Sequence, residues 1–154
     1  MIYLGIDPGK AGALAYIMGE TVSVFSFDEN VYNAALGSAA LMQENGEHVF
    51  CCLEHVGAMP GQGVTSMFSF GENFGFIRGL LHAHCISYEL VRPQKWKREF
   101  SITGDKNTSI AVCKRLFPDV PLRRTERCRK DDDGLAEAVL LAEYARRKMQ
   151  RAQF

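Results

Sequence analysis

The sequence predicts an α/β fold: a five-stranded mixed sheet, with three antiparallel strands followed by two parallel strands, flanked by helices. Over the first 27 positions, short apolar runs rich in β-favouring residues alternate with turn residues. Longer helical stretches separate the later strands, and a carboxylate stands at the end of two strands. The 154 residues suffice for one domain spanning 1–154, and no Pro/Gly/Ser-rich linker indicates a second.

The opening stretch 1–9, MIYLGIDPG, is the element around which the other predictions are arranged. Its apolar residues are typical of a buried central strand, and Asp7-Pro8-Gly9 ends that strand with turn residues. A carboxylate at the end of a buried strand is costly to keep charged unless a cation or hydrogen bonds compensate it. Asp7 therefore indicates a metal site, with a simple turn-capping aspartate as the alternative.

The next elements predict a second acid at the same place. Strands over 11–18 and 21–27 form an antiparallel meander across short turns, and a packed helix over 30–44 ends at Asn45-Gly46. The apolar strand 48–53 is then followed by Glu54. Because active sites gather at the carboxyl edge of parallel strands, we expect Asp7 and Glu54 to lie together.

Residues 64–84 predict a long helix in which Gly71, Gly75 and Gly79 share one face. Such a face allows the close approach of a second helix or a second subunit. The phenylalanines of this stretch are expected to serve the core or an interface. A fifth strand follows over 85–91.

The zero net charge conceals a separation of charge along the chain. Residues 1–91 hold 2 Lys/Arg against 9 Asp/Glu, whereas residues 92–130 hold 12 against 4. A basic stretch that includes Trp96 and Phe100 favours contact with nucleic-acid phosphates over a merely solvated loop. The cations expected to bind DNA are Arg92, Lys95, Lys97, Arg98, Lys106, Arg123 and Arg124.

A run of three aspartates, Asp131, Asp132 and Asp133, opens the last helix. A helix with Asp105 as its N-cap is predicted to end before Pro118, and the loop 121–130 leads from it to the aspartates. Acids in a first helical turn are stabilised by the helix dipole, so capping explains one or two of them. The apolar face that follows must pack on the sheet, which brings the last acid close to it.

Composition excludes several classes of protein. No run approaches the roughly 18 to 20 apolar residues of a membrane span, and the N-terminus lacks a secretory signal pattern. The five cysteines have no CxxC spacing. They indicate reduced thiols in a cytoplasmic protein and argue against a zinc site.

At this point the sequence resembles a RuvC-type Holliday junction resolvase, a crossover junction endodeoxyribonuclease of the RNase H-like superfamily, in a compact form such as bacteriophages carry. The resemblance covers most of the chain in the family's order, and a phage protein would act in the host cytoplasm. The motifs that carry it are LGIDPG at 4–9, LEHV at 53–56, the helix 62–81, the stretch 93–106 with its two lysines, and DDGLAEAVLLA at 132–142.

The resemblance implies four acidic metal ligands, of which Asp7, Glu54 and Asp133 match directly. The remaining acid of the family lies three residues before the last one, where this chain has Lys130; Asp132, or else Asp131, is expected to serve instead. Two Mg²⁺ ions, which Mn²⁺ can replace, would then hydrolyse a phosphodiester. The family's two basic positions are matched by Lys97 and Lys106, which would offset charge in the transition state.

The resemblance also implies a homodimer, built through the helix 64–84, that cuts four-way or branched DNA by paired symmetric nicks. Where the bacterial enzyme has an aromatic residue that stacks at the junction, this chain has Gly57, so Met59 or Phe68 is expected to take its part. Three alternatives stay open: a broader nuclease that cuts forks and flaps, a nuclease for structured RNA, and a non-catalytic junction-binding protein. A sugar-kinase or actin-like ATPase needs two such domains, and the chain is too short for that.

Overall fold

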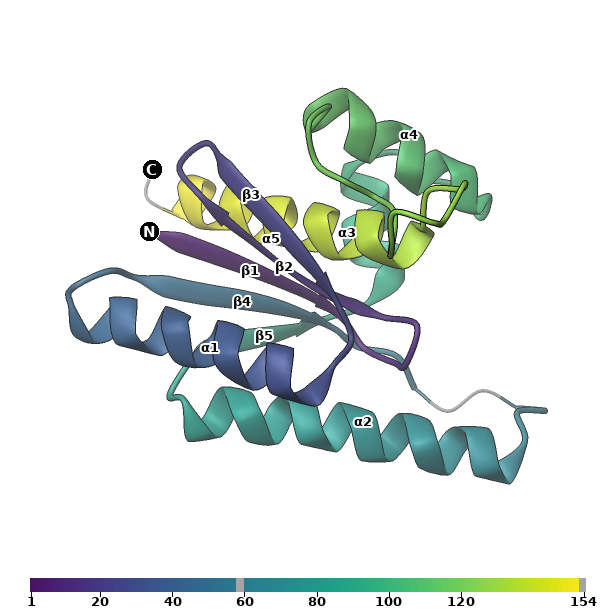
Figure 1. The fold of residues 1–154 in the computed structure, drawn as a ribbon, viewed down its shortest axis with the longest axis horizontal. Helices are drawn as coiled ribbons and strands as arrows, with labels where there is room; N and C mark the ends of the chain where they lie inside the picture. The colour runs from purple at the N-terminus through teal and green to yellow at the C-terminus, as the bar shows by residue number, and fades with distance from the viewer. Residues whose placement is uncertain (58–59, 153–154) are drawn as a thin grey trace.

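The first strand of the chain lies at the centre of a single sheet (Figure 1). The computed structural model describes residues 1–57 and 60–152. The strands are β1 (Ile2–Asp7), β2 (Ala13–Met18), β3 (Thr21–Ser26), β4 (Val49–Glu54) and β5 (Ser87–Val91). The helices are α1 (Glu29–Glu44), α2 (Val64–Ala83), α3 (Pro93–Glu99), α4 (Lys106–Leu116) and α5 (Asp133–Ala152).

The strand order is β3-β2-β1-β4-β5. β1 pairs antiparallel with β2, which pairs antiparallel with β3. β1 also pairs parallel with β4, which pairs parallel with β5. This arrangement confirms the predicted sheet of three antiparallel and two parallel strands. In the β1–β4 register Ile6 lies opposite Leu53, so the next residues, Asp7 and Glu54, end neighbouring strands at one edge.

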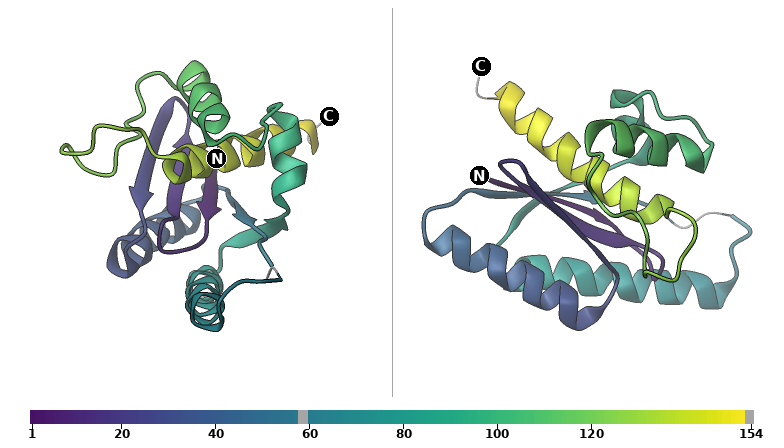
Figure 2. Two further views of the ribbon diagram at one scale, coloured as in Figure 1. Left: turned by 90° about the vertical axis from the view of Figure 1, so that its right-hand side faces the viewer. Right: turned by 45° about the horizontal axis from the view of Figure 1, so that its top comes forward.

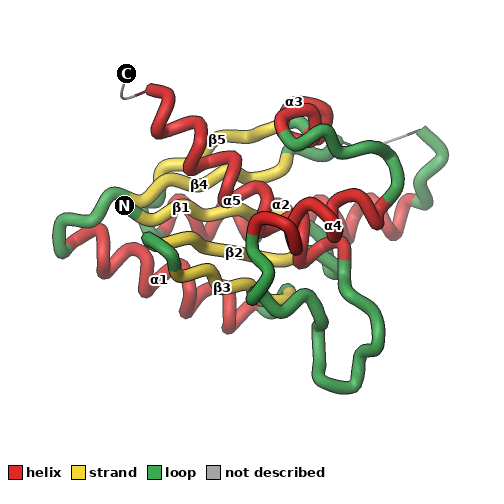
Figure 3. The backbone as a smooth tube through the Cα atoms, turned by 90° about the horizontal axis from the view of Figure 1, so that it is seen from above, coloured by secondary structure: helices red, strands yellow, loops and turns green. Residues whose placement is uncertain are grey.

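Helices cover both faces of the sheet. α5 crosses one face with α3 and α4 beside it, and α1 and α2 lie against the other (Figures 1 and 2). Seen from above, α5 runs diagonally over the strands (Figure 3). The alternation of side chains along β1 divides its residues between two cores, with Tyr3 facing α5 and with Ile2, Leu4 and Ile6 facing α1 and α2.

The backbone of α5 lies directly on β1 at Gly5. A Cβ atom at Gly5 would be 2.2 Å from the amide nitrogen of Ala142 and 2.3 Å from the carbonyl oxygen of Ala138. Only a glycine on the strand and small residues on the helix permit this approach. The contact fixes the position of α5 relative to the end of β1, and therefore relative to Asp7.

Two helices begin at the aspartate caps that favour such starts. The side chain of Asp28 accepts hydrogen bonds from the amides of Asn30 and Val31 at the start of α1. The predicted cap of α4 is confirmed, because Asp105 accepts a hydrogen bond of 2.9 Å from the amide of Asn107.

The short helix α3 was not predicted, because its polar sequence lacks a helical apolar period. Pro93 occupies its first turn, where a missing N–H costs nothing. Tertiary contacts hold it: Trp96 and Phe100 are buried, and Glu99 forms ion pairs with Arg147 and Arg151 of α5. The helix therefore depends on packing against α5 rather than on intrinsic propensity.

The cysteines are free thiols, and Cys51, Cys52 and Cys113 are buried in the core. Such burial is ordinary for a small apolar side chain. Within the described ranges, no helix has the length and apolar character that crossing a membrane requires.

Candidate active site

Asp7 and Glu54 meet at the carboxyl edge of the sheet, on the face covered by α5. Asp7 is the last residue of β1 and Glu54 the last of β4, and both follow the alternation that points Gly5 and Cys52 toward α5. Glu54 is only 5% exposed. The two acids singled out from the sequence are thus neighbours.

The first turns of α5 add two more carboxylates. Asp133 is the first residue of the helix, and Glu137 lies four residues later on the same face. Both are close enough to Asp7 to raise its pKa by charge repulsion. Glu137 was missed in the sequence, where it stands inside an apolar run; its spacing of four from Asp133 is the signal that could have identified it.

Helix α3 presents two adjacent side chains to these acids. The indole Nε1 of Trp96 donates a buried hydrogen bond of 2.9 Å to Oε1 of Glu54. Next to it, Nζ of Lys97 lies 2.7 Å from Oε1 of Glu137, which also accepts a 3.0 Å hydrogen bond from the hydroxyl of Ser109 on α4. Trp96 was predicted only as an aromatic of the basic region, and its link to Glu54 had no sequence signal.

Burial and mutual repulsion shape the electrostatics of the site. Burial is the main cause of a pKa for Asp7 well above its ordinary value. The carboxylates of Glu54, Glu137 and Asp133 raise this pKa further, whereas Lys97 lowers it. Burial also raises the pKa of Glu54, opposed by the hydrogen bond from Trp96. The cluster holds more negative charge than its environment favours.

Asp132 lies beside this cluster but is engaged elsewhere. Its carboxylate receives two hydrogen bonds of 2.7 Å from Arg124 and one of 3.1 Å from the amide of Leu135, so it caps α5. Burial acts to raise the pKa of Asp132, but these hydrogen bonds have the larger combined effect and lower this pKa. Asp131 pairs with Lys114 and lies 3.7 Å from Arg123. Their service as metal ligands stays a prediction.

The basic residues expected at DNA take two different positions. Arg92, Lys95 and Arg98 are exposed on or next to α3. Lys106 is also exposed and pairs with Asp133 at 3.2 Å. Arg124 is instead turned inward, since besides Asp132 it donates to the backbone carbonyls of Ala11 and Gly12. It joins the last helix to the turn after β1.

A groove opens between α3 and the loop 101–104 that follows it, beside these cations. It has a volume of about 580 Å³, and Lys97, Arg98, Ser101 and Thr103 are among its lining residues. Lys97 lines this groove and also binds Glu137, so this lysine connects the groove to the carboxylates.

Of the residues considered for a stacking role at the junction, the structure describes Gly57 and Phe68. Gly57 has open space around it, and Met59 lies outside the described residues. Phe68 is 72% exposed near the start of α2. Its role in stacking stays a prediction.

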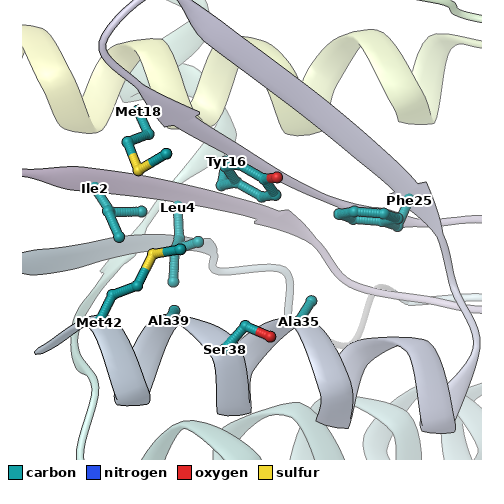
Figure 4. A pocket seen from close by; sticks show the side chains of 9 residues that line it. All are labelled: Ile2, Leu4, Tyr16, Met18, Phe25, Ala35, Ser38, Ala39 and Met42. Atoms are coloured by element: carbon teal, nitrogen blue, oxygen red, sulfur yellow. The ribbon is translucent and has the colours of Figure 1, made fainter. Parts of the chain in front are cut away.

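The apolar pocket of the molecule is separate from the acids. It lies between α1 and the strands β1 to β3, on the sheet face away from α5, and encloses about 150 Å³ (Figure 4). Its lining is apolar apart from the polar ends of Tyr16 and Ser38. No carboxylate, histidine or cysteine is among its lining residues.

Carboxylate oxygens are the ligands that Mg²⁺ and Mn²⁺ prefer. In the part of the chain that the structure describes, however, no three His, Cys, Asp or Glu side chains are grouped so as to hold a metal ion. Two of the acids are paired with lysines instead, Glu137 with Lys97 and Asp133 with Lys106. The donor set suits a hard cation in kind, and its excess negative charge is what such a cation would offset.

Solved structures show where this fold has been seen before. A Thermus thermophilus RuvC in complex with a Holliday junction substrate matches with a TM-score of 0.59 and 12% identity, over 97% of this chain and 96% of that chain. The chain has the RuvC fold. A second Thermus thermophilus RuvC structure matches this fold with a TM-score of 0.56 and 14% identity, over 97% of both chains.

The yeast mitochondrial Holliday junction resolvase Ydc2 also matches, with a TM-score of 0.55, 13% identity, and coverage of 98% of this chain and 80% of that chain. No family model matches the sequence, and no curated protein matches it. The resemblance to RuvC inferred from short motifs is therefore supported at the level of the fold, by solved structures whose sequences are 12–14% identical to this chain.

Proposed function

We propose that this protein is a metal-dependent endonuclease that resolves four-way DNA junctions by paired symmetric nicks. The observation that carries the proposal is the convergence of Asp7, Glu54, Asp133 and Glu137 at one sheet edge of a RuvC fold. A solved protein of this fold is described in complex with a Holliday junction substrate. Phosphodiester hydrolysis is the chemistry that a cluster of hard carboxylates beside cationic side chains serves best.

Two Mg²⁺ ions, or Mn²⁺ in their place, are proposed to be held by these acids. Bound ions of this kind activate a water molecule and stabilise the leaving oxygen during in-line hydrolysis. Asp7, whose pKa responds to the other three acids, would be one of the residues that hold them. Lys97 and Lys106 would exchange their ion pairs with Glu137 and Asp133 for contacts to the DNA phosphate, where their charge opposes the negative charge of the transition state.

Glu137 is our choice for the fourth acid, ahead of Asp132. Glu137 is close enough to raise the pKa of both Asp7 and Glu54, whereas Asp132 is bonded to Arg124 and to the first turn of α5. A capping carboxylate that left its helix would leave backbone amides unsatisfied. With Glu137 as the fourth acid, the site needs no acid at position 130, where this chain has a lysine.

The DNA backbone is proposed to follow the groove between α3 and the loop 101–104. Arg98 and Lys97 line it, and Arg92 and Lys95 lie beside it. Phosphate contacts of this kind supply affinity that falls steeply with salt. The acidic remainder of the chain would repel DNA elsewhere and so favour a substrate that reaches the site from this side.

A homodimer is proposed, with α2 as its interface. Val64 is 85% exposed and Phe68 is exposed too, which is unusual for large apolar side chains. An added Cβ at Gly71, Gly75 or Gly79 would meet nothing within 4 Å, so this face is open to close approach. A two-fold dimer would place one site on each of the two strands to be cut.

Cleavage of a labelled synthetic four-way junction tests the proposal, beside a fork and a linear duplex, in Mg²⁺ and in EDTA. We expect paired nicks on the junction that EDTA and Asp7→Asn abolish while binding persists. Equal cutting of the fork would favour the broader branched-DNA nuclease. Binding without cutting under every metal condition would instead favour a non-catalytic junction-binding protein. In such a protein Lys97 and Lys106, rather than metal ions, would balance the charge of Glu137 and Asp133.

A further inference from the structure

We propose that Trp96 is a positioning residue that fixes the carboxylate of Glu54 in the active site. The inference rests on the proposed role of Glu54 as one of the site's acids. Trp96 is fully buried, and its Nε1 donates to Oε1 of Glu54 at 2.9 Å. No other tryptophan occurs in the chain.

The bond restricts the orientation of the Glu54 carboxylate. An indole has a single N–H donor and no acceptor, and a buried carboxylate needs donors because it has lost water. With Oε1 bonded to Trp96, the carboxylate cannot rotate without breaking this hydrogen bond. Glu54 therefore presents its remaining lone pairs in a fixed direction, which a freely rotating carboxylate would not do.

Trp96 cannot act by touching DNA, because none of its surface is exposed. Its ring contacts two residues close to it in sequence, neither of which bonds to Glu54. Nζ of Lys97 lies 5.3 Å from the centre of the indole ring, and the ring of Phe100 packs against it edge-on, with centroids 6.4 Å apart and planes at 66°. Glu99 ties the same helix to α5 through Arg147.

Adjacent residues of α3 thus hold both Glu54 and Glu137. Trp96 bonds to the acid at the end of β4, and Lys97 bonds to the acid on α5. The two contacts differ in kind, since the lysine can leave for a phosphate whereas the buried indole cannot. Trp96 is therefore the fixed contact of the pair, and Lys97 the exchangeable one.

Because the chain has one tryptophan, its ¹H–¹⁵N spectrum contains one indole signal, and that signal tests the contact without any cleavage. We expect the Nε1 proton of Trp96 to exchange slowly with solvent and its signal to move in Glu54→Gln. Asp133→Asn, a change at an acid that Trp96 does not contact in this structure, is the matched control. An indole signal that is the same in Glu54→Gln and wild type would overturn the proposal.

Kinetics then separate positioning from packing. Trp96→Phe keeps the apolar ring but removes the N–H, so kcat for junction cleavage should fall by about tenfold or more, as for other outer contacts to site ligands. KM should stay within about twofold, because the residue does not touch DNA. Phe100→Leu, which thins the same packing without reaching Glu54, should lower the melting temperature and keep kcat close to wild type.

Equal losses of kcat in Trp96→Phe and Phe100→Leu would show a packing role alone and would refute positioning. The outcomes also separate this proposal from the proposed function. A wild-type protein that cuts no junction, yet shows the expected indole response, would refute the nuclease and support the Trp96 contact. A cutting protein whose Trp96→Phe variant matches wild type would refute only the positioning role.

Discussion

Replacing Gly5 with alanine should destabilise the protein more than almost any other single methyl addition. The new Cβ would lie 2.2 Å from the amide nitrogen of Ala142 and 2.3 Å from the carbonyl oxygen of Ala138, where ordinary contacts begin near 3.4 Å. Both atoms belong to the backbone of α5, so no side-chain rotation relieves the clash. The helix must move by about 1 Å, and overpacking of this kind costs about 3 kcal/mol.

The loss can be measured by urea unfolding. With an m-value of about 2 kcal/mol/M, a loss of about 3 kcal/mol lowers the midpoint by about 1.5 M at unchanged m. Gly104→Ala is the matched control, since a Cβ there meets nothing within 4 Å and no positive φ has to be kept, and it should change the stability by no more than about 0.5–1 kcal/mol. A Gly5→Ala midpoint equal to that of wild type would refute the argument that α5 rests on the β1 backbone.

Three further results are expected. Glu137→Gln should reduce junction cleavage at least about a hundredfold with binding retained. Asp132→Asn should mainly lower the melting temperature, because the cap of α5 is lost. Loss of cleavage in Asp132→Asn but not in Glu137→Gln would restore Asp132 as the fourth acid. Chelation should stop cleavage, and added Mg²⁺ or Mn²⁺ should restore it; cutting that persists in EDTA would exclude a metal. Hydrogen bonding and ion pairing with Arg151 lower the pKa of Glu99 below its ordinary value of 4.5. The ionised Glu99 side chain therefore stabilises the folded protein above pH 4.5. This stabilisation is lost as the pH falls through the pKa that Glu99 has in the folded state. Glu99→Gln should therefore lower the melting temperature at pH 7 more than at about pH 3, and equal losses at both would contradict this.

Most of the fold could be predicted because the strands are short, apolar and ended by turn residues. The chain order, the mixed sheet and the long helix over 64–84 follow from local pattern alone. α3 could not be predicted in the same way, since what holds it is burial of Trp96 and ion pairs to a helix about fifty residues later.

The residues of the site could also be predicted only where a local pattern in the sequence marks them. Asp7 and Glu54 were identified because each follows a strand, and strand ends can be located in a sequence. For the fourth acid the sequence offered Asp132 or Asp131 and did not single out Glu137, because the choice depends on where α5 begins and which residue Arg124 meets. Arg124 lies in a loop without a periodic pattern, so its inward turn toward Ala11 had no local signal.

The packing of β1 against α5 has a consequence for how the protein folds. The first strand and the last helix, which are separated by more than a hundred residues, lie backbone against backbone at Gly5. Contacts between such distant positions require a large loop to close before they stabilise anything, which slows folding. Until α5 docks, one face of the sheet stays uncovered and Asp7 stays apart from Glu137. The proposed active site is therefore complete only when the first strand and the last helix have packed together.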